Sequence, residues 1–121
     1  MTEFTGKLTT HVLDTAKGGP ASGLVIELWQ ISDNNRNLLG TFTTNDDGRI
    51  NQPILGGPDF CVGDYELLFF AGDYLRSSHA IDVDRLFLDL IPIRFGIDDA
   101  NQHYHVPLLL SPYGYSTYRG S

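Results

Sequence analysis

Two histidines are the first residues in this chain whose type and position suggest chemistry. If the segments around them are strands, alternation places His11 on the same side as Leu13 and places His105 on the same side as Pro107 and Leu109. The ordinary pKa of imidazole suits proton transfer near neutral pH. Because apolar residues share these sides, we interpret both histidines as lining a cleft or a subunit interface. The competing interpretation is that each is an ordinary surface residue.

Arg49 follows the turn sequence Asp46-Asp47-Gly48 directly. It could pair with one of these aspartates, which would add little stability. It could instead be a fixed cation that orients a carbonyl-rich or anionic small molecule. Arg49 alone does not decide between these two roles.

His103 and His105 would lie on one face of the same strand, at a spacing that a metal ion could use. No carboxylate or cysteine is arranged in the sequence to complete such a site. We therefore expect no metal ion.

The tetrapeptide Tyr118-Arg119-Gly120-Ser121 follows a segment that has the character of a strand. The last residues of most domains fray, so a strand that continues almost to this tetrapeptide is unusual. Ser121 would supply a hydroxyl group and a carboxylate. The alternative is a domain that simply ends at its last strand.

Short strands must position these residues. Alternating or continuous apolar runs bounded by turn residues predict strands over 8–13, 24–31, 38–44, 65–71, 86–97, 103–110 and 113–118, with one short helix over 72–79. Pro92 inside the fifth run indicates an edge strand or a bulge. Seven or eight short strands with frequent turns predict an all-β fold, an antiparallel β-sandwich.

Composition narrows the class of protein. The 121 residues include 8 Lys and Arg against 15 Asp and Glu, which gives a formal net charge of −7. Such a surface repels phosphate backbones, so we expect no nucleic-acid partner. Charged residues are only 19% of the chain and hydrophobic residues 41%. This balance indicates an apolar surface covered by another subunit.

The cysteine count and the apolar segments predict where in the cell the chain is located. One cysteine, Cys61, excludes an internal disulfide and fits a reducing compartment. Residues 1–7 have no apolar stretch of the signal-peptide kind, and no apolar run is long enough to span a bilayer. We expect a single domain, residues 1–121, that is cytoplasmic and has no membrane partner.

Four sequence motifs carry a resemblance to a known family. They are LTTHVLDT at residues 8–15 followed by GPA at 19–21, NDDGR at 45–49, HYHVPLLLSP at 103–112 and YRGS at 118–121. In this order they resemble the motifs of the transthyretin-related 5-hydroxyisourate hydrolases. The resemblance covers essentially the whole chain. Transthyretins share the fold of this family but lack the final tetrapeptide and both histidines.

The resemblance implies a transthyretin-like antiparallel β-sandwich of two four-stranded sheets, assembled as a homotetramer that is a dimer of dimers. The active sites would lie in a channel between dimers. The implied reaction in urate (purine) catabolism is hydrolysis of 5-hydroxyisourate to 2-oxo-4-hydroxy-4-carboxy-5-ureidoimidazoline. It opens a cyclic amide and needs no cofactor and no metal.

The same resemblance suggests roles for individual residues. His11 and His105 would position and deprotonate a water molecule, and Arg49 would bind substrate oxygens and stabilise developing charge. Tyr118 would close the channel. Ser121, with Arg119 and Gly120, would complete the site by hydrogen bonding. The assigned catalytic residues are therefore His11, Arg49, His105 and Ser121, and the assigned substrate-binding residues are His11, Arg49, Tyr118, Arg119 and Gly120.

Two other classes of function compete with an enzyme. One is a transthyretin-like carrier that binds an aromatic small molecule in the tetramer channel without turnover. The polar histidines and Tyr118 argue against it, because a hydrophobic ligand favours an apolar channel. The other is a β-sandwich interaction module, for which removal of the last four residues would leave function intact.

Overall fold

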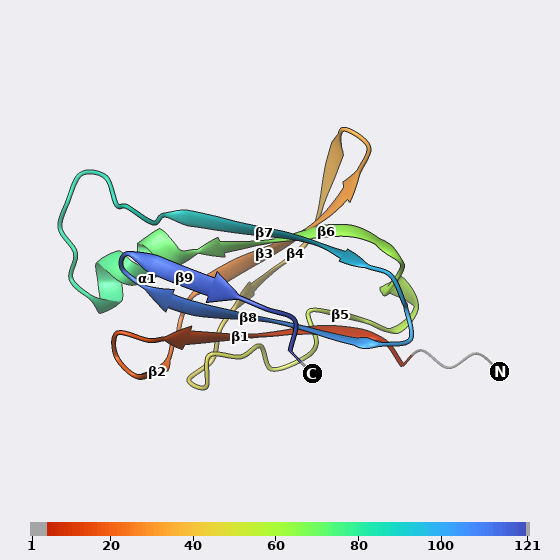
Figure 1. Cartoon of the computed structure of the whole chain (residues 1–121), viewed down its shortest axis with the longest axis horizontal. Helices are drawn as coiled ribbons and strands as arrows, with labels where there is room; N and C mark the ends of the chain where they lie inside the picture. Colours follow the sequence, from red (N-terminus) through yellow and green to blue (C-terminus); the bar gives the residue numbers. More distant parts are fainter. Residues whose placement is uncertain (1–4, 121) are drawn as a thin grey trace.

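The computed structural model describes residues 5–120, which form two β-sheets packed face to face (Figure 1). Sheet A contains β1 (Lys7–Asp14), β2 (Gly19–Pro20), β5 (Leu55–Gly56), β8 (His103–Ser111) and β9 (Gly114–Thr117). Sheet B contains β3 (Val25–Ser32), β4 (Asn35–Thr43), β6 (Gly63–Phe70) and β7 (Leu90–Ile97). Within the described residues the helices are the 3-10 turn η1 (Gly57–Asp59) and the short helix α1 (Ala71–Ser78). The predicted all-β sandwich with one short α-helix is confirmed.

Sheet B has the strand order β4-β3-β6-β7, and each neighbouring pair is antiparallel. β7 is therefore an edge strand, as Pro92 predicts, because proline cannot donate to a neighbouring strand. The predicted strand began at Leu86, which is wrong: β7 begins at Leu90. The preceding segment is tied to α1 instead, because the Gly72 amide donates to the Asp89 carbonyl over 2.9 Å.

Sheet A departs from the predicted antiparallel, four-stranded arrangement. Its order is β2-β1-β8-β9, and β5 also pairs with β1, so it has five strands. The extra strand arises because β2 and β5, two residues each, pair with opposite ends of β1. The central pair β1–β8 is parallel along its whole length. Side-chain alternation is the same in parallel and antiparallel strands, so the sequence pattern could not distinguish them.

The core lies between the two sheets. Its fully buried side chains come from alternate positions of the long strands and from α1, including Leu8, Val12, Ile26, Leu28, Leu67, Phe69, Leu75, Leu108 and Leu110. In β1 and β8 the even-numbered residues face this core, with Thr10 and Asp14 as the buried polar members. The odd-numbered residues face outward, so the predicted outer faces of His11 and His105 are confirmed.

Asp14 anchors the helix region to sheet A. Its carboxylate is fully buried and accepts hydrogen bonds from the Tyr74 hydroxyl, from His79 Nε2, both over 2.7 Å, and from the Lys17 amide over 3.0 Å. Burial would raise the pKa of Asp14, but these hydrogen bonds together lower it below its ordinary value. Burial, and then the hydrogen bond to Asp14, raise the pKa of Tyr74 to about 12. The network joins the end of β1 to Tyr74 within α1 and to His79, the residue that caps the end of α1.

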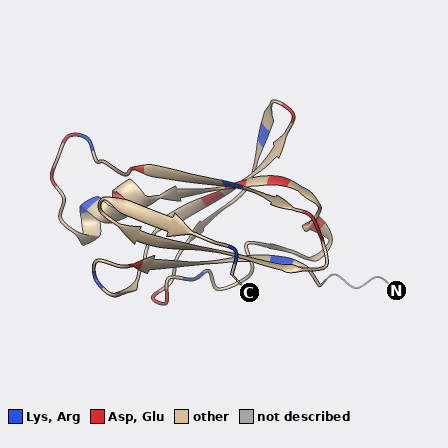
Figure 2. Cartoon of the chain, viewed as in Figure 1, with Lys and Arg blue, Asp and Glu red and all other residues tan. Residues whose placement is uncertain are grey.

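Charged residues lie mainly in turns and at strand ends (Figure 2). β8 and β9 contain no Asp, Glu, Lys or Arg. Among residues 5–120, no helix has the length and apolar character needed to cross a membrane.

Candidate active site

The parallel register of β1 and β8 creates the site on the outer face of sheet A. Lys7 pairs with His103, and Thr9 pairs with His105. Because odd-numbered residues on both strands face outward, the two histidines of β8 lie directly beside Thr9 of β1. His11 lies one outward position further along β1.

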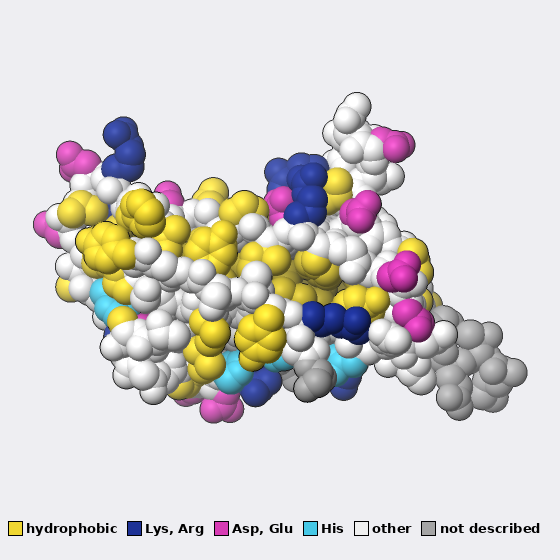
Figure 3. Space-filling view, in the orientation of Figure 1, with side chains coloured by type: hydrophobic (Ala, Val, Ile, Leu, Met, Phe, Trp, Pro, Cys, Tyr) yellow, Lys and Arg dark blue, Asp and Glu magenta, His cyan; other side chains and the backbone are white. Residues whose placement is uncertain are grey.

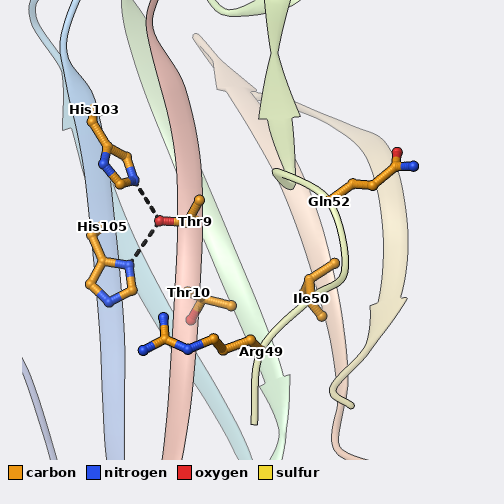
Figure 4. A pocket seen from close by; sticks show the side chains of 7 residues that line it. All are labelled: Thr9, Thr10, Arg49, Ile50, Gln52, His103 and His105. Carbon is orange, nitrogen blue, oxygen red and sulfur yellow. Dashed lines mark hydrogen bonds between the residues drawn. The ribbon is translucent and has the colours of Figure 1, made fainter. Parts of the chain in front are cut away.

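The Thr9 hydroxyl contacts both rings (Figure 4). Its Oγ1 lies 2.6 Å from His103 Nε2 and 2.8 Å from His105 Nδ1. Both are hydrogen-bond distances. The second nitrogen of His105, Nε2, is left free of this contact and points toward Arg49 (Figure 4).

Arg49 is placed by a tight turn that Asn45 organises. The Asn45 side-chain oxygen accepts hydrogen bonds from the amides of Asp47, over 2.8 Å, and Arg49, over 3.1 Å. Gly48 has φ +75°, a left-handed conformation that favours glycine, and a Cβ there would overlap the Val12 carbonyl oxygen. The turn is tied to β1 by the Val12 amide, which donates to the Gly48 carbonyl over 2.8 Å.

His11 is held against the same turn. Its Nε2 lies 2.9 Å from the Asp47 carbonyl oxygen, and an isolated bridge joins the backbones of His11 and Arg49. A carbonyl oxygen only accepts, so Nε2 carries the proton in neutral His11 and Nδ1 keeps the lone pair. Asn45, Gly48 and the β1 backbone thus bring Arg49 beside His11.

A cavity of about 350 Å³ opens at this place. It is lined by Thr9, Thr10, Arg49, Ile50, Gln52, His103 and His105 (Figure 4). Two of the predicted site residues, Arg49 and His105, therefore line one cavity, and His11 adjoins it through Arg49. The cavity combines one cation with imidazoles, which suits a small polar substrate rather than a large apolar one.

The histidines of the site are set to be neutral at pH 7. Burial, and then the positive charge of Arg49, lower the pKa of His105, and His103 and His11 act in the same direction. Burial and Arg49 also lower the pKa of His11, although the Asp47 carbonyl opposes the shift. The pKa of His103 is lowered by burial and by Lys7 and Arg119. Neutral imidazoles can accept a proton, so they are available as general bases.

Gly120 packs directly on His105. The Gly120 amide donates a 2.7 Å hydrogen bond to the His105 carbonyl. A Cβ at position 120 would lie 2.5 Å from His105 Cδ2. Only glycine fits this contact without displacing the ring. The C-terminal segment thus supports His105 from the side opposite Thr9's strand.

Arg119 and Tyr118 lie elsewhere. The Arg119 guanidinium stacks 4.0 Å above the Tyr104 ring and donates to the Gln102 side chain over 2.9 Å. Arg119 and Tyr118 line a second, mostly apolar cavity of about 320 Å³ between the edges of the two sheets. Ser121 lies outside the described residues.

Thr9 and His103 are the site residues that the sequence did not assign. The only available signals were that Thr9 shares a face with His11 and that His103 shares a face with His105. Within residues 5–120, no group of three or more His, Cys, Asp and Glu side chains is arranged to hold a metal ion.

Fold and site together define a transthyretin-like β-sandwich that carries a histidine–arginine cavity on one sheet. The model of the HIUase/Transthyretin family matches residues 8–120, and the chain belongs to this family.

Named relatives agree with this assignment. The chain is 60% identical to 5-hydroxyisourate hydrolase 2 of Rhizobium meliloti, over 96% of this chain and 97% of the relative. The solved structure of Klebsiella pneumoniae 5-hydroxyisourate hydrolase matches with a TM-score of 0.78 and 32% identity, over 95% of this chain and 99% of that one. A crystal structure of (S)-allantoin synthase matches with a TM-score of 0.90 and 49% identity over 98% of this chain, which spans 46% of that protein.

Proposed function

We propose that this chain hydrolyses 5-hydroxyisourate to 2-oxo-4-hydroxy-4-carboxy-5-ureidoimidazoline, a step of urate degradation. The observation that carries the proposal is a cavity lined by His105 and Arg49, with His11 bridged to the backbone of Arg49, in a chain 60% identical to a 5-hydroxyisourate hydrolase. Such relatives favour an enzyme over the carrier that shares the fold.

The two histidines supply proton transfer. His105 lines the cavity and is neutral at pH 7, so it can take a proton from a water molecule as that water attacks the cyclic amide carbonyl. His11 has its lone pair on Nδ1 and lies beside Arg49, where it can act as the partner base or return a proton to the leaving nitrogen. The tautomer of His11 is fixed by Asp47, which makes it a stable second member of the pair.

Arg49 supplies positive charge. A planar guanidinium can donate two parallel hydrogen bonds to the oxygens of an oxidised purine ring. As water adds to the carbonyl, negative charge develops on its oxygen, and a fixed cation stabilises that charge more than it stabilises the ground state. The Asn45 turn fixes the backbone of Arg49 at the edge of the cavity.

The final tetrapeptide completes the proposed site. Gly120 holds His105 by its backbone, and Ser121 would hydrogen-bond substrate or water. Tyr118 would close the channel, and Arg119 would help to complete the site by hydrogen bonding. For Arg119, the stacking on Tyr104 supports a role in fixing this segment.

The proposal includes a homotetramer, a dimer of dimers, built by the whole chain as a single domain. β7 and β9 are edge strands, and their unpaired edges can add strands from another copy. Figure 3 shows hydrophobic side chains gathered on this side of the molecule. The exposed large hydrophobic residues of β7, β9 and the segments that adjoin them include Phe87, Leu90, Tyr113, Tyr115 and Tyr118. The expected native mass is four times the mass of one chain, and a monomer at micromolar concentration would contradict this assembly.

The proposed location is the cytoplasm. Support comes from the exposed free thiol of Cys61, which persists most readily in a reducing compartment. Fractionation of cells that express the untagged chain would test it.

The activity is tested by following the absorbance decay of freshly generated 5-hydroxyisourate. The purified chain should accelerate the decay at catalytic concentration. The same sample should bind an aromatic hormone such as thyroxine weakly or not at all. Hormone binding without turnover would instead support the carrier.

A further inference from the structure

The Thr9 hydroxyl joins two imidazoles, and one of them, His103, has no role in the hydrolysis described above. Thr9 Oγ1 lies within 2.8 Å of His105 Nδ1 and within 2.6 Å of His103 Nε2. The parallel register of β1 and β8 fixes these three residues as neighbours. The contact is therefore built into the sheet and does not depend on a loop.

A hydroxyl group carries one proton, so Thr9 can donate to only one ring and must accept from the other. If Thr9 accepts from His105 Nδ1–H, it donates to the lone pair of His103 Nε2. Nε2 of His105 is then unprotonated and can act as a base. In the opposite arrangement His105 Nε2 carries the proton, and the same ring has no lone pair to offer the cavity.

The charges around the pair select the first arrangement. Arg49, on the 45–49 turn, extends toward His105 Nε2 (Figure 4). A guanidinium has donors and no acceptor, so a lone pair facing it is favoured and an N–H facing it is repelled. The other charged or titratable groups that act on these rings are Lys7 and His11 on β1 and Arg119 on the C-terminal segment. All of these disfavour an additional positive charge, which keeps both rings neutral.

We propose that Thr9 and His103 are positioning residues, which hold His105 as its Nδ1–H tautomer with Nε2 open to the cavity. His103 acts through Thr9: by accepting the Thr9 proton, it prevents Thr9 from donating to His105. When His105 takes a proton at Nε2, its Nδ1–H bond to Thr9 becomes charge-assisted and stronger. The proposal rests on the proposed hydrolysis only for its kinetic consequences.

The tautomer can be measured directly in the resting protein. With 15N-labelled histidine, only four imidazoles contribute to the spectrum, and two-bond N–H correlations report which nitrogen of each ring is protonated. At pH 8, we expect His105 to be protonated at Nδ1 in the wild type, in Thr9→Ser and in His103→Gln, whose amide oxygen can accept the Thr9 proton. In Thr9→Val the two tautomers should coexist. In His103→Ala, Thr9 is free to donate to His105 while Arg49 still opposes a proton on Nε2, so a substantial Nε2–H population should appear beside the Nδ1–H form.

Kinetics supply a second readout. Thr9→Val and His103→Ala should lower kcat by about 10- to 100-fold, part of the 10²–10⁴ that a general base contributes, with KM changed by less than about 2-fold. Thr9→Ser and His103→Gln should retain most of kcat. Thr43→Val, at an exposed threonine on β4, is the matched control and should behave as the wild type.

Two results would overturn the proposal. One is a wild-type His105 that is protonated at Nε2. The other is a Thr9→Val and a His103→Ala protein that keep both the wild-type tautomer and the wild-type kcat. If the wild type does not hydrolyse 5-hydroxyisourate, the proposed function fails, and the NMR result still decides whether Thr9 and His103 set the tautomer.

Discussion

Gly120 donates a 2.7 Å hydrogen bond to the carbonyl of His105, and its Cα lies so close that an added Cβ would come within 2.5 Å of the His105 ring. The two residues belong to different sequence motifs, His105 to HYHVPLLLSP and Gly120 to YRGS. Their contact explains why a glycine is needed in the final tetrapeptide, and it links that tetrapeptide to a proposed catalytic base.

Gly120→Ala should therefore impair the enzyme without unfolding it. The new methyl group must displace the His105 ring, and a misplacement of about 1 Å can cost on the order of 10²-fold in rate. We expect a loss of that order in kcat for 5-hydroxyisourate, with little change in the melting temperature.

Gly19→Ala is the matched control, because a Cβ at position 19 has no heavy atom within 4 Å. It should retain wild-type kcat. If Gly120→Ala also retained wild-type kcat, the contact with His105 would have no catalytic consequence.

Arg49 should depress the pKa of the neighbouring histidines as well as bind substrate. In Arg49→Gln the positive charge is absent, so the pKa values of His105 and His11 should rise. Burial would still lower the pKa of His105. NMR titration of the histidine Cε1–H resonances measures both. Since an acid-side fall in activity reports protonation of the base, the activity that remains should fall at a higher pH than in the wild type.

The same variant should lose kcat/KM by on the order of 10²–10³-fold, the typical cost of removing one charge-stabilising donor. Arg85→Gln, at an exposed arginine in the loop before β7, should leave both the titrations and kcat/KM unchanged. Unchanged histidine pKa values in Arg49→Gln would contradict the arrangement of charges described for the cavity.

Much of this site follows from strand alternation. That pattern was enough to place His11 and His105 on the outer face of sheet A, because facing depends only on local spacing. It could not reveal that β1 and β8 are parallel neighbours, and so it could not bring Thr9 beside His103 and His105. Register between strands separated by some 90 residues is a property of the whole sandwich.

Two further differences have local causes. The apolar residues Leu86 to Leu88 continue the alternation of β7, yet the Gly72–Asp89 hydrogen bond holds that segment against α1 and outside the sheet. Arg119 belongs to a motif with an expected substrate contact, but the face of Tyr104 and the Gln102 side chain bind its guanidinium. Strand alternation describes only which side of a strand a residue faces, so it could not predict either of these contacts.

Asp14 should make the free energy of unfolding depend on pH. Its folded-state pKa lies below the ordinary value of 3.8, so its contribution is fully present above that value and is lost as pH falls through the folded pKa. Asp14→Asn should destabilise the chain by on the order of 2–3 kcal/mol at pH 7, because Tyr74 and His79, which both donate to Asp14 Oδ2, lose their charged acceptor.

Urea unfolding at pH 7 and at pH 3 measures this effect. The difference in the free energy of unfolding between wild type and Asp14→Asn should shrink at the lower pH. Asp82→Asn, at an exposed aspartate, is the control and should match the wild type at pH 7. An equal difference at both pH values would mean that the Asp14 charge does not stabilise the fold.

The central claim is that His105 is a base in the hydrolysis of 5-hydroxyisourate. The most direct test compares the decay of freshly generated 5-hydroxyisourate in the presence of the wild type and of His105→Ala. The variant must first be shown to be folded and assembled. We predict that the wild type turns over the substrate and that His105→Ala loses kcat by on the order of 10²–10⁴-fold, the usual contribution of a general base. A His105→Ala protein with near-native kcat would contradict this assignment.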